Sequence, residues 1–571
     1  MTTFETKLSR ISYLIGKKIT KDELEKLLSD IGMELASINK EKITIELTAE
    51  RPDLLSPVGI SRALKSFLGF EKGMPKYTVK ESNYKIKVDR SVEKIRPFTV
   101  AVVVKNLKMT DDNLKEIIYV QEKLHQTYGR DRKNFAIGIY PMENIEFPIT
   151  FKADSPDKIK FRPLGSNSEI TADKILKQNP TGKKYANLLD GLNKYPYFID
   201  AKGDILSMPP IINSEKTGRV TENTTSVFIE VSGHDLLTIE KYLNILSAMF
   251  SDFSGELFSV KIEYPYEEYL KNAFQNDLKN KSNIIETPQL EPGKITIDIK
   301  NINSLIGLKL NSSEIKKLLE KMMYSVVETK GDRITFNYPK IRTDIWHEVD
   351  VADDVARSYG FENIKETLPS ISTIAKTMPI SDFKEKVSEL LKGYGFIEAY
   401  NFALTSKEEQ FDMMQQKQEE SIALEKSADK AYNMVRKWLL PEMLKALRSN
   451  KDCAFPQKVY ESGFVVIPNK EKDTLSENLL KLCVLVTDDN INFNSAKLIL
   501  NSLANDLGLE YKIAANKKPY FIKGRSGTIL SDEKEIGIIG EVHPKVLTNW
   551  NLTRPIAAFE IDLEKLFSVL K

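Results

Sequence analysis

The stretch Leu305-Ile306-Gly307 repeats Leu14-Ile15-Gly16, and the similarity continues at the same spacing over residues 14–70 and 305–361. Position 14 corresponds to position 305, and this offset of 291 holds along the whole stretch without a gap. Other matched pairs are Arg51 with Arg342, Asp53 with Asp344, Gly69 with Gly360 and Phe70 with Phe361. A match of this length predicts two copies of one folded module.

Three acidic residues distinguish the second copy from the first. The differing pairs are Gly59 and Asp350, Arg62 and Asp353, and Ala63 and Asp354. Residues that both copies keep are expected to be scaffold. The three carboxylates that only one copy carries therefore need another explanation.

The three acids lie in the stretch 342–357, which we expect to be helical. Val351 and Val355 supply an apolar stripe at helical spacing, and Asp344 would lie near the N-cap. The three acids would share one face, and with Asp344 they form a cluster of oxygens that suits Mg²⁺. Alternatively, acids near a helix start favour the helix dipole, and Arg357 would pair with the second of the three. The residue types alone leave both interpretations open.

The composition excludes several classes of protein. The 571 residues contain 83 Lys and Arg against 81 Asp and Glu, so any nucleic-acid site must be a local patch. Only Cys453 and Cys483 are present, which excludes a disulfide framework and cysteine-based zinc sites and fits a reducing cytosol. The N-terminal residues lack the apolar core of a signal peptide, and no apolar run reaches the length of a membrane span.

Turn signals and periodicity divide the chain into segments. We expect a first module at 1–85, a middle region at 95–260, a polar linker at 272–292, the second copy of the module at 293–365 and an α+β domain at 375–571. No Gly-rich phosphate loop and no Gly-x-Ser-x-Gly motif is present. A basic cluster at 130–133 could meet phosphates or form a solvated loop, and the hydroxyl-rich stretch 221–225 could line a pocket or cap a turn.

Several runs together resemble one family. They are Glu50-Arg51-Pro52-Asp53-Leu54-Leu55-Ser56, Ala136-Ile137-Gly138-Ile139-Tyr140, Phe161-Arg162-Pro163-Leu164, Ser207-Met208-Pro209-Pro210-Ile211-Ile212-Asn213-Ser214, residues 342–361, Tyr460-Glu461-Ser462-Gly463 and Gly540-Glu541-Val542-His543-Pro544. In this order they resemble the β subunits of phenylalanine–tRNA ligases of the archaeal and eukaryotic-cytosolic type. The resemblance covers essentially the whole chain.

The resemblance implies an α+β multidomain fold. A duplicated small helical module would flank a tRNA-editing domain, and a class II synthetase-like antiparallel sheet domain without ATP motifs would follow. The stretch 557–562 agrees, because it lacks the Gly-rich, Arg-bearing motif of a working ATP site. The implied enzyme is a cytoplasmic (αβ)₂ heterotetramer that charges tRNA(Phe) with phenylalanine, with ATP used on the α subunit.

The resemblance also implies site residues. The family's Mg²⁺ ligands fall on Asp344, Asp350, Asp353 and Asp354, which include the three acids unique to the second copy. One departure lies at Pro141-Met142-Glu143, where the family more often has an acidic residue directly after Tyr140.

An editing site is expected on physical grounds. Tyrosine differs from phenylalanine by one hydroxyl, and an apolar pocket rejects an added hydroxyl by only about 10²-fold, so a hydrolytic site for mischarged Tyr-tRNA(Phe) is needed. We place Leu206, Asn213, Ser214, Thr221 and Glu222 in that site. Two alternatives remain: a free-standing tRNA-editing hydrolase, and a non-catalytic RNA-binding scaffold.

Overall fold

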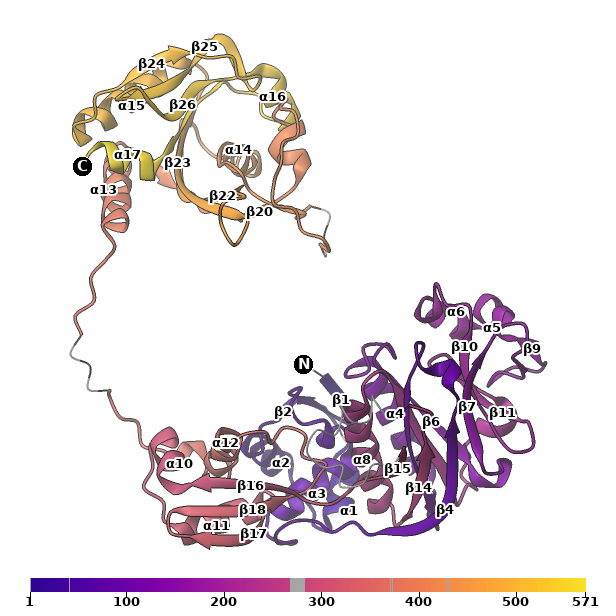
Figure 1. The fold of residues 1–571 in the computed structure, drawn as a ribbon. Helices are drawn as coiled ribbons and strands as arrows, with labels where there is room; N and C mark the ends of the chain where they lie inside the picture. The colour runs from indigo at the N-terminus through magenta and orange to yellow at the C-terminus, as the bar shows by residue number, and fades with distance from the viewer. Residues whose placement is uncertain are drawn as a thin grey trace. The chain divides into compact units, whose positions relative to one another are not determined.

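The computed structural model describes residues 2–40, 42–266, 283–369, 371, 373–427, 429 and 431–571 (Figure 1). The described chain forms two units, Met1–Leu368 and Pro369–Lys571. The boundary falls within the short segment that separates the second module from the predicted domain at 375–571. Each unit has its own hydrophobic core.

The two copies of the repeated module have the same order of strands and α-helices, and differ only in where a short 3₁₀ turn lies. The first contains β1 (Thr2–Lys7), α1 (Leu8–Ile15), α2 (Lys21–Asp30), β2 (Glu34–Asn39), β3 (Lys42–Leu47), η1 (Pro52–Leu54) and α3 (Pro57–Phe67). The second contains β16 (Gly293–Asp298), α10 (Ile299–Ile306), α11 (Ser312–Lys321), β17 (Ser325–Lys330), β18 (Arg333–Tyr338), α12 (Glu348–Tyr359) and η5 (Phe361–Asn363). Their sheets, β1-β3-β2 and β16-β18-β17, are both antiparallel. The expectation of small helical modules is therefore wrong in one respect, because each module is built on a three-stranded sheet.

Conserved local chemistry explains why both copies fold alike. Gly16 and Gly307 end α1 and α10 in the left-handed region, with φ of 82° and 73°. Thr20 and Asn311 then cap α2 and α11 by accepting backbone N–H groups. In each module a short helix is thus stopped by glycine and the next is started by a polar cap, which fixes the turn between them.

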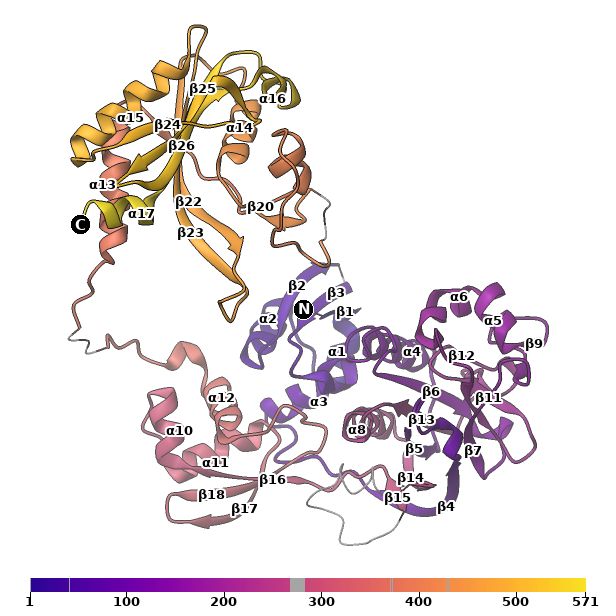
Figure 2. The same ribbon diagram turned by 45° about the horizontal axis from the view of Figure 1, so that its top comes forward.

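The two modules pack against each other reciprocally within the first unit. Arg357 of the second module donates to the Ile31 carbonyl of the first over 3.1 Å. At the position equivalent to Arg357, Ser66 of the first module donates to the Glu320 carbonyl of the second over 3.2 Å. Contacts exchanged between equivalent regions are those of an approximate two-fold axis. The duplicated modules therefore form an internal pseudo-dimer (Figure 2).

The middle region forms a ten-stranded sheet between the two modules in sequence. Its main elements are β4 (Val79–Val88), β5 (Phe98–Lys105), α4 (Asp111–Gln126), β6 (Phe135–Pro141), β7 (Ile149–Asp154), β10 (Tyr195–Ile199), β11 (Ile205–Met208), β12 (Ile212–Asn213), β13 (Val227–Gly233), α8 (Leu236–Asp252), β14 (Glu256–Glu263) and β15 (Ile284–Thr287). The strand order is β12-β11-β10-β7-β4-β14-β5-β13-β6, and β15 pairs with β14. Shorter elements are η2 (Arg90–Val92), η3 (Met142–Asn144), β8 (Lys160–Phe161), β9 (Ile170–Thr171), α5 (Ala172–Gln178), α6 (Pro180–Tyr185), η4 (Ala186–Leu189) and α7 (Glu215–Gly218).

Two predicted boundaries differ from the structure. Strand β4 belongs to the large sheet, although its first residues fall within the segment 1–85 assigned to the first module. Strand β15 pairs with β14, so the part of the sheet at residues 284–287 lies inside the predicted linker 272–292. The remainder of that linker up to residue 282 lies outside the described residues. Polar composition and prolines hid a strand that gains its backbone hydrogen bonds from β14, in the interior of the sheet.

The second unit is a seven-stranded sheet with helices on both faces. Its helices are α13 (Pro379–Gly393), η6 (Glu408–Asp412), α14 (Leu440–Ser449), α15 (Phe493–Leu507), α16 (Pro544–Asn549) and α17 (Leu563–Val569). Its strands are β19 (Ile397–Glu398), β20 (Leu404–Thr405), β21 (Met434–Val435), β22 (Gln457–Pro468), β23 (Ser476–Thr487), β24 (Lys512–Ala515), β25 (Phe521–Ser531), β26 (Lys534–Val542) and β27 (Ile556–Asp562). The sheet order is β19-β22-β23-β27-β26-β25-β24, antiparallel except for the first pair, while β20 and β21 form a separate ribbon.

Alternation along the central strands produces two cores. On β23, Leu482 and Val484 join the core under α13, α15 and α17, whereas Cys483 and Leu485 join the core under α14 and α16. Because successive side chains of a strand point to opposite faces, a run of apolar residues covers both sides of the sheet at once. The antiparallel sheet expected for the segment 375–571 is therefore present, with helices on each face (Figure 2).

Candidate functional site

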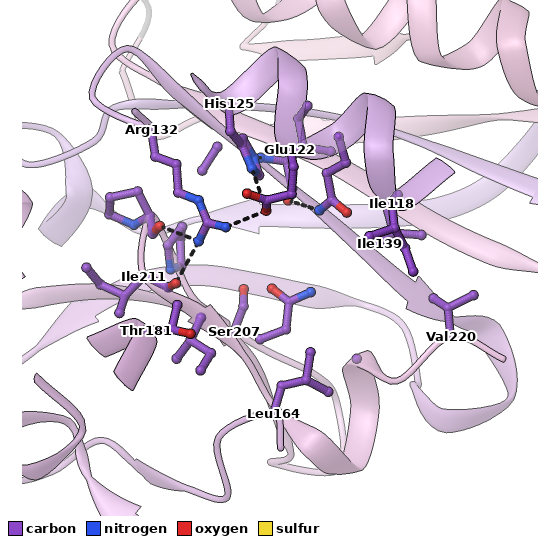
Figure 3. A pocket seen from close by; sticks show the side chains of 18 of the residues that line it. Ile118, Glu122, His125, Arg132, Ile139, Leu164, Thr181, Ser207, Ile211 and Val220 are labelled. Carbon is purple, nitrogen blue, oxygen red and sulfur yellow. Dashed lines mark hydrogen bonds and ion pairs between the residues drawn. The ribbon is translucent and has the colours of Figure 1, made fainter. Parts of the chain in front are cut away.

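A cavity of about 450 Å³ lies in the middle region, between α4 and the large sheet (Figure 3). Strand β6, the segment from β11 to β12, and residues near α6 and α7 complete its walls. Apolar side chains such as Ile118, Ile139 and Leu164 supply much of the surface. The polar groups among them decide what the cavity can recognise.

Tyr140, Ser207 and Glu230 form a buried polar group at the sheet side of the cavity. The Tyr140 hydroxyl lies 2.7 Å from Ser207 Oγ and 3.1 Å from Glu230 Oε1. Gly138 makes room for this group, because a Cβ there would come within 2.1 Å of the tyrosine oxygen and 2.5 Å of Glu230 Oε1. Both Ser207 and Glu230 line the cavity.

Glu230 is unusual for a carboxyl group. It lies in β13, whose residues are all buried. Burial raises the pKa of Glu230 to about 8, even though the nearby charge of Arg96 and the hydroxyl of Tyr140 lower it. Its second oxygen, Oε2, is buried and has no hydrogen-bond partner among the described residues. A carboxyl group that is protonated near neutral pH can both donate and accept a hydrogen bond.

The helix side of the cavity carries a charged group from α4 and the turn after it. Glu122 accepts from Arg132 over 2.6 Å and lies 3.5 Å from His125 Nδ1. The interaction with His125, together with the charge of Arg132, lowers the pKa of Glu122 to about 2, against the effect of burial. His125 accepts the Ile137 backbone N–H at Nε2 over 2.8 Å, and burial lowers its pKa. This wall therefore holds a carboxylate and a guanidinium beside a neutral imidazole.

Of the five residues predicted for the editing site, three lie close together: the Ser214 N–H donates to the Leu206 carbonyl over 2.8 Å, and Asn213 pairs with Ser207 of β11. Asn213 lines the cavity. Leu206 is fully buried in the core and Ser214 caps α7 by accepting from the Lys216 N–H, and neither lines it. Thr221 and Glu222 are exposed, and the Thr221 hydroxyl accepts from the N–H two residues later. The sequence left two roles open for the hydroxyl-rich stretch 221–225, lining a pocket or capping a turn. The hydrogen bond at Thr221 is that of a capped turn.

Sequence reasoning missed the polar groups that do line the cavity. Ser207 lies directly after Leu206, and alternation along β11 turns the serine rather than the leucine toward the cavity. Glu230 interrupts an otherwise apolar strand, and a lone carboxylate in such a run is a usable signal. Arg132 belongs to the basic cluster at 130–133, but it is bound within the fold rather than solvated.

The acids of the second module have protein partners. Arg342 donates to Asp344 through Nε (2.9 Å) and Nη2 (2.6 Å), and Nη2 also lies 2.7 Å from Asp354 Oδ2. The Tyr324 hydroxyl donates to the same oxygen of Asp354 over 2.7 Å. Burial would raise the pKa of Asp344, but Arg342 brings it below its ordinary value. One buried guanidinium thus neutralises two of the four predicted metal ligands.

The other two acids point to separate partners. Asp350 accepts the N–H groups of Trp346 and His347, each over 2.7 Å, and so closes a capping box at the start of α12. Asp353 pairs with Arg357 over 2.6 Å at the surface. The helix therefore begins at Glu348 with His347 as its N-cap, and the expectation of Asp344 near the N-cap is wrong.

The acids as placed do not fit a metal site. Within the part of the chain that the structure describes, no three His, Cys, Asp or Glu side chains are grouped so as to hold a metal ion. A hard cation such as Mg²⁺ needs several oxygens that converge on one point. Here two of the carboxylates converge on Arg342, one pairs with Arg357, and one caps the N-terminus of α12.

The central strand of the second unit is committed to structural contacts. Glu560 of β27 accepts the N–H groups of Leu439 and Leu440 through Oε2 and the Lys481 ammonium through Oε1, at 3.0–3.1 Å. These bonds satisfy the N-terminus of α14. The Glu560 carboxylate is therefore already engaged by the α14 N-terminus and by Lys481.

Comparison with known proteins matches both modules and the second unit. Residues 1–70 match the Phe-tRNA synthetase beta subunit B1 domain, residues 295–361 the tRNA synthetase B5 domain, and residues 364–563 the phenylalanyl tRNA synthetase beta chain CLM domain. The first two ranges coincide with the duplicated modules. The described residues include no helix that is long and apolar enough to cross a membrane.

Whole-chain relatives agree with these matches. The chain is 38% identical to the phenylalanine–tRNA ligase beta subunits of Pyrococcus horikoshii and Pyrococcus furiosus, over 99% of this chain and 100% of each relative. An N-terminal fragment of the phenylalanyl-tRNA synthetase beta subunit from Pyrococcus horikoshii, solved by crystallography, is 38% identical. It covers 63% of this chain and 99% of its own length, with a TM-score of 0.58. The chain belongs to the family of phenylalanine–tRNA ligase β subunits.

Proposed function

We propose that the chain works with an α subunit in a cytoplasmic (αβ)₂ heterotetramer that charges tRNA(Phe) with phenylalanine. Phenylalanine and ATP bind the α subunit in this proposal. The engagement of Glu560 supports it, because the α14 N-terminus and the Lys481 ammonium already bind this carboxylate and are not free for a nucleotide phosphate. The isolated, folded chain should not exchange pyrophosphate into ATP with phenylalanine, and exchange at a rate comparable to the heterotetramer would contradict the proposal.

We further propose that the cavity of the middle region hydrolyses mischarged Tyr-tRNA(Phe). One observation carries this proposal: Glu230 lines the cavity with a buried oxygen, Oε2, that lacks a hydrogen-bond partner among the described residues. A tyrosyl hydroxyl can donate to or accept from that carboxyl group, whereas a phenyl ring leaves it unpaired. Sites that hydrogen-bond a substrate hydroxyl reject the analogue lacking it by roughly 10⁴–10⁵-fold.

The reaction itself adds water across the ester that joins tyrosine to the tRNA ribose, and it releases tyrosine and free tRNA. The cavity contributes recognition and positioning to this reaction. Glu230 and Ser207 would hold the phenol, and Asn213 would orient the aminoacyl group at the other edge of the sheet. Their burial makes each hydrogen bond stronger than it would be in water.

The test compares Tyr-tRNA(Phe) and Phe-tRNA(Phe) deacylation by the heterotetramer with parental chain and with Glu230→Val. Valine has a high strand propensity, so it suits β13 while it removes the carboxyl group. We expect at least a 100-fold loss of Tyr-tRNA hydrolysis and parental Phe charging. Parental hydrolysis of Tyr-tRNA by the Glu230→Val complex would contradict the recognition role.

Mg²⁺ has a limited place in this proposal. The ion would accompany ATP on the α subunit. A further ion on Asp344, Asp350, Asp353 and Asp354 stays a prediction from the sequence, and the present partners of these carboxylates argue against it. No step of the proposed charging or editing reaction depends on an ion held by this chain.

A further inference from the structure

Arg132 spans the cavity between two elements that are far apart in sequence (Figure 3). Its Nη2 donates to Glu122 Oε1 of α4 over 2.6 Å, and its Nη1 donates to the Ile211 carbonyl over 2.9 Å. The guanidinium also lies 4.3 Å from the ring centre of Tyr185. The planar fork of arginine can make such contacts in fixed directions at the same time, whereas lysine offers only one compact charge.

The segment that Arg132 holds makes few backbone hydrogen bonds of its own. Residues Pro209 and Pro210, between β11 and β12, have no backbone N–H to donate. The Ile211 N–H closes a turn onto the Met208 carbonyl over 2.8 Å, and the Arg132 side chain donates to the Ile211 carbonyl. Asn213 follows two residues later and lines the cavity, so a shift of this segment would move a cavity wall.

The turn that carries Arg132 is itself constrained. Arg130, Asp131 and Arg132 all have φ in the left-handed region, at 47°, 53° and 69°. Non-glycine residues persist there only when surrounding contacts over-determine them, and runs of them gather at functional sites. The backbone N–H of Arg132 donates to the His125 carbonyl over 3.1 Å, which ties the turn to the end of α4.

We propose that Arg132 is a positioning residue for editing, because it ties the Pro209–Ile211 segment to α4 and sets the width of the cavity. This inference rests on the proposed hydrolysis of Tyr-tRNA. Glu122 shares the role as the anchor on the helix. Arg132 does not touch the reacting ester, so it acts through the placement of Ser207 and Asn213, which flank the tied segment.

Two variants test the link in the heterotetramer. Arg132→Lys keeps the positive charge but cannot reach both partners, and Glu122→Gln keeps the size of the anchor but removes its charge. We expect each to lower kcat/KM for Tyr-tRNA deacylation by roughly 10–100-fold, mainly through kcat, because displaced groups no longer meet the substrate in a productive geometry. Both variants disrupt the same contact between Arg132 and Glu122. The double variant should therefore lose no more deacylation activity than Arg132→Lys alone.

Arg130→Ala is the matched control. Arg130 is exposed and lies in the same left-handed turn. The Arg130→Ala variant should deacylate Tyr-tRNA at the parental rate. In all variants used for kinetics, Phe charging and the melting temperature should match those of the parent. A contact with tRNA phosphate would instead raise KM without lowering kcat, and that result for Arg132→Lys would overturn the positioning role.

Amide hydrogen exchange supplies a readout that does not depend on activity. The N–H groups of Ile211 and Ser214 donate to the Met208 and Leu206 carbonyls, over 2.8 Å each. We expect their exchange to accelerate in Arg132→Lys and to stay parental in Arg130→Ala. If the parental and Arg132→Lys complexes deacylate Tyr-tRNA equally fast, the positioning role of Arg132 is overturned, but the proposed editing function is not. A parental complex that leaves Tyr-tRNA intact would overturn the editing function and the role of Arg132 together.

Discussion

Arg51 and Arg342 occupy the same position in the two modules, and each forms a two-pronged ion pair with the aspartate two residues later. The Arg51 pair with Asp53 has N–O distances of 2.8 and 2.9 Å, and the Arg342 pair with Asp344 has distances of 2.9 and 2.6 Å. Only the second module adds Asp354 to its arginine. Its extra acid therefore extends a charge pair that both modules already possess.

This relationship leads to a prediction about Asp354. Asp354→Asn should destabilise the first unit by about 3 kcal/mol, because it removes a buried charge from the Arg342 pair. Asp353→Asn, which changes an exposed neighbour, should stay within about 0.5 kcal/mol of the parent. Urea unfolding in EDTA and in Mg²⁺ should give the same values. If Mg²⁺ stabilises the parent but not Asp354→Asn, then the four acids do form a metal site.

The packing between the modules predicts the effect of a single methyl group. A Cβ on Gly32 would lie 1.4 Å from Arg357 Nη1, and φ there is 81°. Gly16 has nearly the same φ, 82°, but nothing lies within 4 Å of its Cβ position. Gly16→Ala should cost about 1–2 kcal/mol for the left-handed backbone alone. Gly32→Ala should cost about 1–3 kcal/mol more, because Arg357 must leave its site. Equal unfolding midpoints for the two variants would exclude Arg357 as a cause.

The raised pKa of Glu230 predicts a pH dependence of stability. In the unfolded chain this group ionises near 4.5, whereas in the folded chain it keeps its proton up to about 8. Stability should therefore fall as the pH rises from 5 to 8, by up to about 1.4 kcal/mol for each unit. Glu230→Gln removes the ionisable group. The free energy of unfolding of this variant, relative to that of the parent, should therefore increase as the pH rises from 5 to 8. Urea unfolding of both chains at pH 5, 6.5 and 8 measures this difference, and a constant gap would show that Glu230 has an ordinary pKa.

The positions of the predicted editing residues separate them into two groups. Asn213→Ala should slow Tyr-tRNA deacylation by at least about tenfold, because its side chain borders the cavity. Thr221→Ala and Glu222→Ala change exposed residues outside the cavity and should act at the parental rate. Phe charging serves as the control in each case. A loss of editing in the second pair alone would place the site near the hydroxyl-rich stretch.

Local patterns made the modular organisation predictable. The repeat at a constant offset identified two modules, because each is built from contiguous residues whose caps and turns are written in the sequence, such as Gly16 and Gly307. The expectation that the three acids share one helix face was wrong, because the side chains of adjacent helix residues point in directions that differ by a large angle. Asp354 turns into the core beside Arg342, whereas Asp353 remains at the surface.

The cavity could not be assembled from the sequence in the same way. Ser207 and Glu230 lie 67 and 90 residues after Tyr140, and Ser207 meets the other two only because β11, near one end of the sheet, comes close to β13 and β6 at the other end. Strand pairing over such distances leaves no periodic mark in a single chain. Arg132 was equally hard to predict, because its turn has three consecutive left-handed residues and none of them is a glycine.

The reciprocal contact between the modules has a consequence for how such a chain can change. In a dimer of identical subunits, a substitution appears on both sides of the axis at once. Here the two sides are encoded separately: Arg357 lies against Gly32, while its counterpart Ser66 donates to the Glu320 carbonyl. Covalent linkage also holds the partners at a high effective concentration whatever the protein concentration. One half can therefore be altered while the other keeps the pair assembled.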